Sequence, residues 1–248
     1  MLAREVREGV AWLRIDRPER RNAIPAAFWG RLRETTAELA GDAAVRAVVV
    51  HGAGDCFSVG ADIDDFPGGA DIDARRRFLT EATTALEEFG ALPKPTVAAV
   101  HGHCIGGGLE LTLACDVVVA DATARFSVPE ARVGLVPGVL LAWGRERIGD
   151  SWLRYLALSG EPLDAEEARL AGLVNFVAGA GEHLDRAAAL AGKLAAGAPR
   201  AVATVKSSLA RPGLGGAVES GVLLQGSEDF AEGSAAFRER RPPRFSGR

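Results

Sequence analysis

The 248-residue sequence predicts a layered α/β fold in one globular unit, on the strength of two repeated turns and a helical last third. A strand pattern ends in Val-His-Gly at residues 50–52, and the same ending returns at residues 100–102. Units of strand, glycine turn and helix therefore repeat. Turns at strand ends often carry function, so we expect the two matched turns to form two halves of one site.

The strand and helix patterns of the first half follow in order. VAWLRI, at residues 10–15, predicts a strand, and the turn RPERRNAI after it is rich in Pro and Arg. A helical pattern then covers about residues 25–41. Three further strand patterns follow: RAVVVHGAG over residues 46–54, PTVAAVHG over residues 95–102 and DVVVADATARFSVPE from residue 116.

From residue 164 onward the patterns are helical. DAEEARLAGLV begins with Asp164 as an N-cap, has an acidic first turn and reaches Gly172 as a stop. HLDRAAALAGKLAAG and PRAVATVKSSLARP show amphipathic helical spacing, with Gly and Pro as punctuation. The last third of the chain is therefore expected to be largely α-helical.

Charge and cysteine content limit the partners and the compartment. The 29 Lys and Arg against 33 Asp and Glu leave a net charge of −4, so no strongly basic field favours nucleic acid or an anionic membrane. Cys56, Cys104 and Cys115 cannot all pair, and no secretory signal opens the chain. No uncharged apolar run approaches the roughly 20 residues that span a bilayer. We expect a reduced, soluble, cytoplasmic protein whose partner is a small molecule or another protein.

Two glycine-containing turns offer free backbone N–H groups. Gly106, Gly107 and Gly108 precede a predicted helix, whose first N–H groups lack intrahelical acceptors and lie at the positive end of the helix dipole. FSVGADI, at residues 57–63, offers a similar amide after Gly60. Two amides converging on one oxygen would form an oxyanion hole, each donor contributing about 3 to 4 kcal/mol of transition-state stabilisation. Either turn alone is also explained by close packing that only Gly allows.

Glu110 is the only formally charged residue between Lys94 and Asp116. Burying a lone carboxylate among Gly, Leu, Ala and Cys is costly, so this side chain needs a partner, a solvent path or a catalytic role. The alternative is an acid in the first turn of a helix, where it stabilises the dipole.

Together these segments resemble the enoyl-CoA hydratase/isomerase (crotonase) superfamily over nearly the whole chain. RPERRNAI resembles the N-terminal substrate turn of that family, GAGDCFSVGADI its first oxyanion segment and KPTVAAVHGHCIGGGLELTLACD its second. FSVPEARVGLVPG resembles the segment with the catalytic carboxylate. The tail segments SGEPLDAEEARLAGLVNFV and SEDFAEGSAAFRERRPPRF also follow the family pattern.

The resemblance implies a spiral core of repeated ββα units that holds the active site over residues 1–190. It implies a C-terminal helical region over residues 191–248 that mediates assembly into a homotrimer or a dimer of trimers. The expected activity is that of an enoyl-CoA hydratase, a hydro-lyase of fatty acid metabolism.

The same resemblance assigns the catalytic groups. Ala61 and Gly107 would supply the two N–H groups that hold the thioester oxygen, while Glu110 and Glu130 match the first and second catalytic glutamates of the hydratases. The two carboxyl groups would activate one water for addition to the β-carbon of a trans-2-enoyl thioester, while a proton reaches the α-carbon. General acid–base help of this kind is worth about 10² to 10⁴ in rate.

Coenzyme A would enter as part of the thioester substrate, so no separate cofactor and no metal are expected. The residues implied in its binding lie in the two N-terminal segments and on the terminal helix, which could belong to a neighbouring subunit: Arg21, Ala23, Val59, Ala61, Asp62, Ile63, Asp64, Phe237 and Arg241. His101, His103 and Cys104 lack the second ligand cluster that a zinc site would need.

Two departures from the family pattern leave alternatives open. Bulky residues 139–143 replace the small residues that usually follow GLVPG, and they could narrow the acyl pocket or shift Glu130. Asp64 stands where many relatives carry a basic or polar residue. With Arg125 and Arg132 nearby, Glu130 by itself also fits an ordinary solvated carboxylate. The alternatives are a crotonase-family isomerase, decarboxylase or hydrolase on another acyl-CoA, or a catalytically silent acyl-CoA binder.

Overall fold

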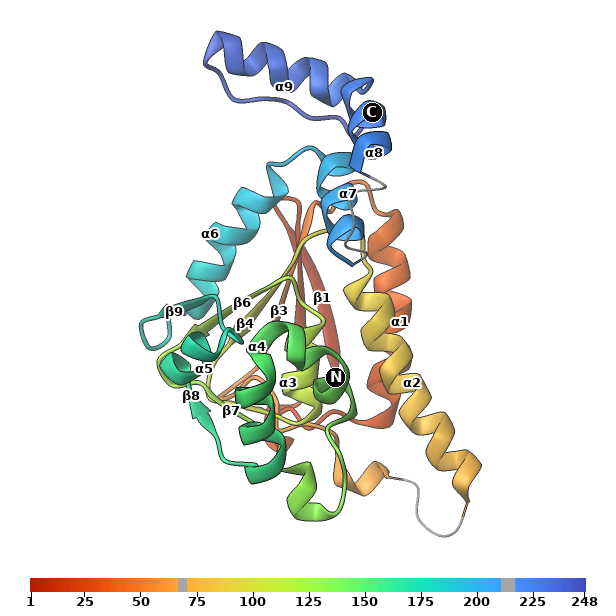
Figure 1. Cartoon of the computed structure of the whole chain (residues 1–248), viewed down its shortest axis with the longest axis vertical. Helices are drawn as coiled ribbons and strands as arrows, with labels where there is room; N and C mark the ends of the chain where they lie inside the picture. Colours follow the sequence, from red (N-terminus) through yellow and green to blue (C-terminus); the bar gives the residue numbers. More distant parts are fainter. Residues whose placement is uncertain (67–70, 211–216) are drawn as a thin grey trace.

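The computed structural model of the chain describes residues 1–66, 71–210 and 217–248 and has the predicted layered α/β architecture (Figure 1). Its larger sheet has the strand order β1-β2-β3-β4-β6-β9, in which β1 runs antiparallel to β2 and the other neighbours are parallel. These strands are β1 (Leu2–Arg7), β2 (Val10–Ile15), β3 (Ala47–Gly52), β4 (Thr96–Val100), β6 (Val117–Asp121) and β9 (Phe176–Ala178).

A smaller sheet lies beyond the carboxyl ends of the parallel strands. It has the order β5-β7-β8, with β5 (His103–Ile105) parallel to β7 (Arg125–Ser127), and β7 antiparallel to β8 (Leu163–Asp164). The chain thus passes from a strand of the larger sheet to a strand of the smaller one and then into a helix, as in β4-β5-α3 and β6-β7-α4. This repetition of two strands and a helix confirms the predicted spiral of ββα units.

Helices cover both faces of the larger sheet, so its strands are buried on two sides. In β3, Val48 and Val50 pack into the main core, while Ala47 and Val49 face a second cluster that includes Ala187 of α6. The main core also takes side chains from the first five helices of the chain. The helices up to this point are α1 (Ala26–Gly41), α2 (Ile72–Gly90), α3 (Gly107–Leu113), α4 (Gly138–Ser159), α5 (Ala165–Ala171) and α6 (His183–Ala195).

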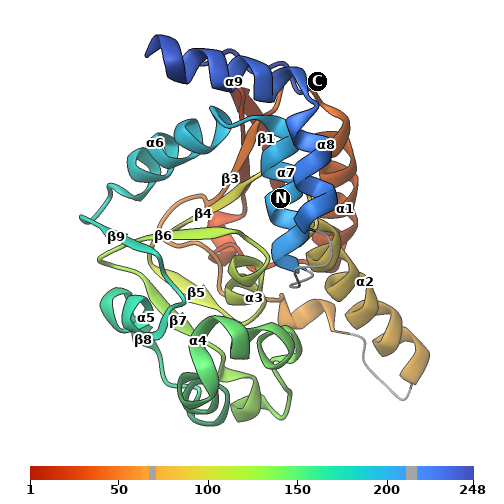
Figure 2. The same cartoon turned by 45° about the horizontal axis from the view of Figure 1, so that its top comes forward.

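The last three helices extend beyond one end of the sheet (Figures 1 and 2). They are α7 (Pro199–Ala210), α8 (Ala217–Gln225) and α9 (Glu228–Glu239). Large apolar side chains remain exposed on them, including Leu209, Leu223 and Phe237. The expected boundary at residue 190 falls inside α6, whose Ala191 is fully buried against the sheet.

Most predicted elements are present, but the patterns did not predict β1, α2 or α4. β1 is a half-exposed edge strand of mixed charge, which removes the alternation that marks a strand. In α4 a left-handed φ of 67° at Gly149 interrupts the helix, and glycines weaken the helical pattern. Within the described residues, no helix combines the length and apolar character that crossing a membrane would require.

Candidate active site

The two glycine turns lie side by side, as their matched sequences predicted. The segment after β3 pairs with β5 through a bridge between Ser58 and Cys104. The Ser58 N–H donates to the His103 carbonyl at 2.9 Å, and the Ile105 N–H donates to the Ser58 carbonyl at 2.9 Å. These bonds bring residues 58–61 next to the N-terminus of α3.

The amides of Ala61 and Gly107 are neighbours in this arrangement. Ala61 forms a parallel bridge with Ile24, whose bonds are made by the Gly60 carbonyl and the Asp62 N–H. The Ala61 N–H therefore points to the opposite edge. A β-carbon on Gly107 would lie 3.6 Å from the Ala61 nitrogen, and neither N–H has an acceptor in the described part of the chain. Two free donors thus lie close enough to share one oxygen ligand.

Gly106 allows the second turn to approach a carboxyl group. Its φ of 51° and ψ of −122° lie in a region that is accessible essentially only to glycine. A β-carbon here would lie 2.6 Å from Oε1 of Glu130. The Gly106 carbonyl accepts the Glu110 N–H at 2.9 Å, so the same residue begins α3 and contacts the opposing glutamate.

Glu110 is bound by the N-terminus of a different helix from its own. Its Oε1 accepts hydrogen bonds from the backbone N–H groups of Val139 at 2.9 Å and Leu140 at 3.2 Å, in the first turn of α4. Burial raises the pKa of Glu110, and these two hydrogen bonds oppose that rise. The carboxylate is partly buried, yet its charge has partners.

Glu130 lies on the short helix η3 (Pro129–Val133) and has fewer hydrogen-bond partners. Its Oε2 is buried and has no hydrogen-bond partner among the described residues. The pKa of Glu130 is raised to about 7: burial is the largest cause, its own backbone N–H opposes the rise, and the charge of Glu110 adds to it. The pKa is thus raised at both carboxyl groups, and Glu130, at about 7, is the one that readily keeps a proton near neutral pH.

The bulky residues at positions 139–143 leave this pairing in place. Val139 and Leu140 are buried in the core, and they contact Glu110 through backbone N–H groups that any non-proline side chain would offer. Trp143 packs against the same core.

The segments implied in coenzyme A binding also meet. The Val59 N–H donates to the Arg21 carbonyl at 3.2 Å, which places the N-terminal turn beside the first oxyanion segment. Arg21 is exposed, Ala23 is buried, and Ile63 keeps 70% of its surface exposed. A ligand lying across these segments would contact both of them.

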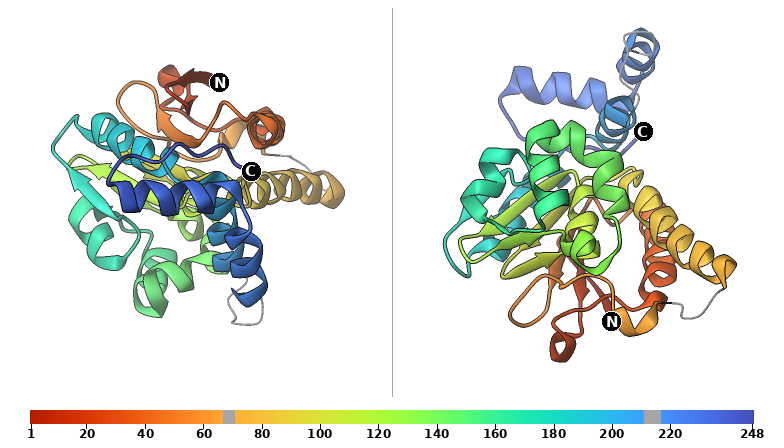
Figure 3. Two further views of the ribbon diagram at one scale, coloured as in Figure 1. Left: turned by 90° about the horizontal axis from the view of Figure 1, so that it is seen from above. Right: turned by 60° about the horizontal axis from the view of Figure 1, so that its bottom comes forward.

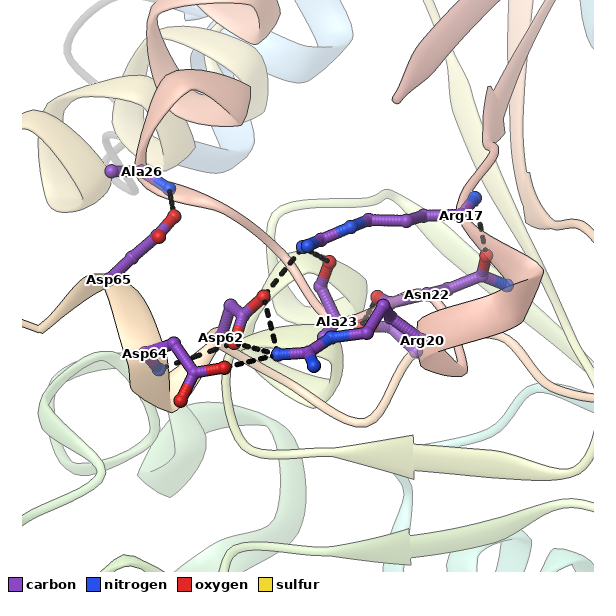
Figure 4. Close-up of polar contacts among 9 residues, drawn as sticks. Arg17, Arg20, Asn22, Ala23, Ala26, Asp62, Asp64 and Asp65 are labelled. Atoms are coloured by element: carbon purple, nitrogen blue, oxygen red, sulfur yellow. Dashed lines mark hydrogen bonds and ion pairs between the residues drawn. The ribbon is translucent and has the colours of Figure 1, made fainter.

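Asp62 and Asp64 are held by arginines of the N-terminal turn (Figure 4). Asp62 is only 4% exposed and accepts hydrogen bonds from Arg17 at 2.7 Å and Arg20 at 3.0 Å. Arg20 also pairs with Asp64. Burial alone would raise the pKa of Asp62, but these arginines and the Asp64 amide outweigh it and lower the pKa. Asp64 thus neutralises Arg20, which limits the anion binding that this arginine could offer.

Phe237 and Arg241 lie far from these segments within the chain. α9 and the N-terminal segments are at opposite ends of the molecule (Figures 1 and 3). Phe237 is 86% exposed, and Arg241 follows the end of α9 and pairs with Glu232 and Glu239. A role for both residues at the site would require a neighbouring subunit.

The sequence reasoning missed three buried or half-buried polar groups that shape the site. Arg17, Asn22 and Ser58 link the segments that carry the two free amides. Asn22 and Ser58 are fully buried, and buried polar side chains are normally hydrogen-bonded. Only Ser58, between Phe57 and Val59, stood out in the sequence as a polar residue in an apolar setting, and the partners that these three residues hold across the site lie more than 30 residues away.

A spiral of ββα units with two free amides beside two carboxyl groups is the arrangement of crotonase-type proteins. A family model described as enoyl-CoA hydratase/isomerase matches residues 5–248. The chain is 35% identical over 251 residues to 2,3-dehydroadipyl-CoA hydratase of Escherichia coli K12, and the match covers 96% of each protein. This chain belongs to the enoyl-CoA hydratase/isomerase family.

Solved structures agree over the full length. DspI of Pseudomonas aeruginosa superposes with a TM-score of 0.94 at 33% identity, covering 99% of this chain and 96% of that one. An enoyl-CoA hydratase from Bacillus anthracis superposes with a TM-score of 0.93 at 27% identity, covering 100% and 99% of the two chains.

Proposed function

We propose that the protein is an enoyl-CoA hydratase, which adds water across the 2,3 double bond of an enoyl-CoA thioester. The observation that carries the proposal is the placement of Glu110 and Glu130 beside the free amides of Ala61 and Gly107. Family membership supports an acyl-CoA thioester as the substrate. The E. coli relative named 2,3-dehydroadipyl-CoA hydratase supports the reaction class.

The two amides would bind the thioester carbonyl oxygen. When water attacks the β-carbon, the electron pair of the double bond moves toward this oxygen and an enolate forms. The N–H groups at Ala61 and Gly107 stabilise the developing negative charge, and the N-terminus of α3 adds a favourable dipole. The glycines keep this surface free of side chains, so that the thioester can approach the backbone.

The two glutamates would divide the proton transfers. Glu110, whose charge is stabilised by two amides of α4, takes a proton from the attacking water. Glu130, with a pKa raised by burial to about 7, gives its proton to the α-carbon. Water oxygen is then bonded to the β-carbon, and the carbonyl is restored.

Coenzyme A would enter only as part of the substrate, lying across the segments of Arg21, Ala23, Val59 and residues 61–64. We further propose that α7, α8 and α9 mediate trimer formation. Their exposed apolar side chains would then be covered by a neighbouring subunit, and Phe237 and Arg241 would reach that neighbour's coenzyme A site.

Hydration of crotonyl-CoA tests the proposal, because it removes the absorbance of the conjugated thioester. We expect turnover by the wild-type protein and a loss of about 10³-fold in kcat for Glu110→Gln, since the amide cannot act as a base. Glutamine keeps an oxygen that can accept the Val139 and Leu140 N–H groups. Glu34→Gln, on the exposed face of α1, is the matched control.

Each other outcome points to a different function. An active Glu110→Gln variant would rule out hydration by this site. Migration of a 3,4 double bond into conjugation, without hydration, would indicate an isomerase. Tight binding of acyl-CoA thioesters without turnover on a broad panel would indicate a silent binder.

A further inference from the structure

The residue after Ala61 carries a buried carboxylate with every acceptor position occupied. Oδ2 of Asp62 accepts from Arg17 Nη1 at 2.7 Å and Arg20 Nη2 at 3.3 Å. Oδ1 accepts from Arg20 Nη2 at 3.0 Å and from the Asp64 N–H at 3.3 Å. The side chain is 4% exposed, so it has little surface left for a ligand (Figure 4).

These bonds fix the peptide that carries the first free amide. The Asp62 N–H donates to the Ile24 carbonyl at 2.8 Å, and the Ile24 N–H donates to the Gly60 carbonyl at 2.8 Å. Ala61 lies between these two bonds. The Asp62 carboxylate adds a third attachment, because Arg17 holds it to the N-terminal turn.

Arg17 is itself fixed by that turn. Its Nη1 also donates to the Ala23 carbonyl at 3.3 Å, and its backbone N–H donates to Oδ1 of Asn22 at 2.9 Å. Asn22 Nδ2 donates to the carbonyls of Ala53 and Cys56, at 2.7 and 2.8 Å, in the loop that leads to the oxyanion segment. The ion pair is therefore connected to both sides of the Ala61 peptide.

The ion pair also has an electrostatic role. A negative charge beside an oxyanion hole opposes the charge that develops on the thioester oxygen. Arg17 and Arg20 neutralise that charge, but Arg20 is 46% exposed and shared with Asp64, whereas Arg17 is 27% exposed. Loss of Arg17 would leave a buried carboxylate next to the hole with a weakened partner.

We propose that Asp62 and Arg17 are positioning residues, which hold the Ala61 amide at the thioester oxygen and keep its surroundings electrically neutral. The Asp62 carboxylate then makes no contact with coenzyme A, and only its backbone faces the ligand. This inference rests on the oxyanion hole of the proposed function.

The test compares Asp62→Asn, Arg17→Met and the double variant. For Asp62→Asn we expect kcat to fall about tenfold with KM changed less than about threefold, and for Arg17→Met a fall of about 100-fold. The double variant should recover toward the value for Asp62→Asn, because the neutral amide that this substitution introduces needs no counter-ion. Arg33→Gln, which breaks an exposed ion pair with Glu88 on α1 and α2, is the matched control.

A second readout separates this inference from the hydratase assignment. Butanoyl-CoA labelled with ¹³C at the thioester carbonyl cannot be hydrated, and polarisation by the hole shifts its carbonyl resonance downfield on binding. We expect a shift in the wild type and a smaller one in Asp62→Asn and Arg17→Met. Thermal unfolding of each variant shows whether it is folded, and Asp62→Asn, nearly isosteric, remains testable if Arg17→Met is not.

The outcomes are distinct. An unchanged carbonyl shift in folded Asp62→Asn, or a rise in KM with kcat unchanged, overturns the positioning role and indicates direct coenzyme A contact. A wild-type shift without hydration of any enoyl-CoA overturns the proposed function and leaves this inference standing. No shift in the wild type overturns both.

Discussion

Glu110 and Glu130 are both partly buried carboxyl groups, but their surroundings differ. Two backbone amides at the start of α4 hold one oxygen of Glu110. Glu130 has a buried oxygen with no partner among the described residues, and Gly106 lies against its other oxygen. Burial raises the pKa of both residues, but two amides of another helix oppose that rise at Glu110, whereas only its own backbone N–H opposes it at Glu130. The difference indicates how two chemically identical side chains can act as base and acid.

The largest effect is expected for Glu130→Gln, which tests the comparison of the two glutamates directly. The variant cannot donate a carboxyl proton to the α-carbon, so we expect kcat for crotonyl-CoA hydration to fall about 10³-fold. Exchange of the α-hydrogen of the product with deuterated water should fall in parallel. If hydration persists in Glu130→Gln, the acid lies elsewhere and the comparison fails.

Gly106→Ala tests the contact on Glu130 without changing either carboxyl group. A β-carbon would lie 2.6 Å from Glu130 Oε1, and φ is 51°, so both the turn and the glutamate must move. We expect kcat to fall about 100-fold, because a displaced proton donor and amide lose alignment. Gly41→Ala, where no atom lies within 4 Å of the added carbon, should retain wild-type kcat.

The pH dependence of kcat/KM sharpens the comparison further. In the proposed mechanism Glu130 acts in its protonated form, and its pKa is raised to about 7, so activity should fall above that pH by up to about tenfold per pH unit. Glu110 is active when charged, and its raised pKa should limit activity on the acidic side. Removal of the alkaline limb in Glu130→Gln would support the assignment. An alkaline limb that survives this substitution contradicts it.

The smallest expected effect concerns His183, a buried histidine outside the site. Its pKa is shifted in the opposite direction to that of Glu130. His183 is 6% exposed and stacks on His101 with ring centroids 4.4 Å apart. The pKa of His183 is lowered to about 4, mainly by burial and then by the charge of His101, while Asp121 opposes the shift. Burial disfavours the charged form in every case, so it raises the pKa of Glu130 and lowers that of His183.

The direction in which pH changes the stability follows from the difference in the pKa of His183 between the folded and the unfolded chain. Below pH 6.5 the unfolded chain protonates His183 while the folded protein does not, so stability is lost as the pH falls from about 6.5 to 4. We expect His183→Gln to remove about 2 to 3 kcal/mol of this pH-dependent loss in the free energy of unfolding. Denaturant unfolding at a series of pH values measures it, with exposed His103→Gln as the control. Equal pH dependence in both variants would contradict the assignment.

Part of the fold and the site could be predicted from local sequence. The repeated Val-His-Gly endings predicted two adjacent turns, and the bridge between Ser58 and Cys104 confirms that they meet. The capping pattern at Asp164 predicted α5, which begins with a capping box at Asp164 and ends at Gly172. These predictions succeeded because strand alternation, caps and glycine turns depend on neighbours within a few residues.

Other features depended on contacts between distant segments. The patterns did not predict α4, so they also did not predict the two amides at its start that hold Glu110. These amides lie 29 and 30 residues from Glu110 in the sequence. The partners of Asp62 lie 42 and 45 residues away, so its carboxylate could not be distinguished from a ligand contact.

The sequence by itself determined the layered α/β fold and the positions of the two amide turns, since these follow from residue type and spacing, and its motifs determined the family and, through that resemblance, the spiral of ββα units. Only the tertiary structure decided which glutamate has the amides of another helix as partners, which one has its pKa raised to about 7, and which aspartate is neutralised. Burial and hydrogen bonding set those properties, and both arise when segments far apart in the chain pack together.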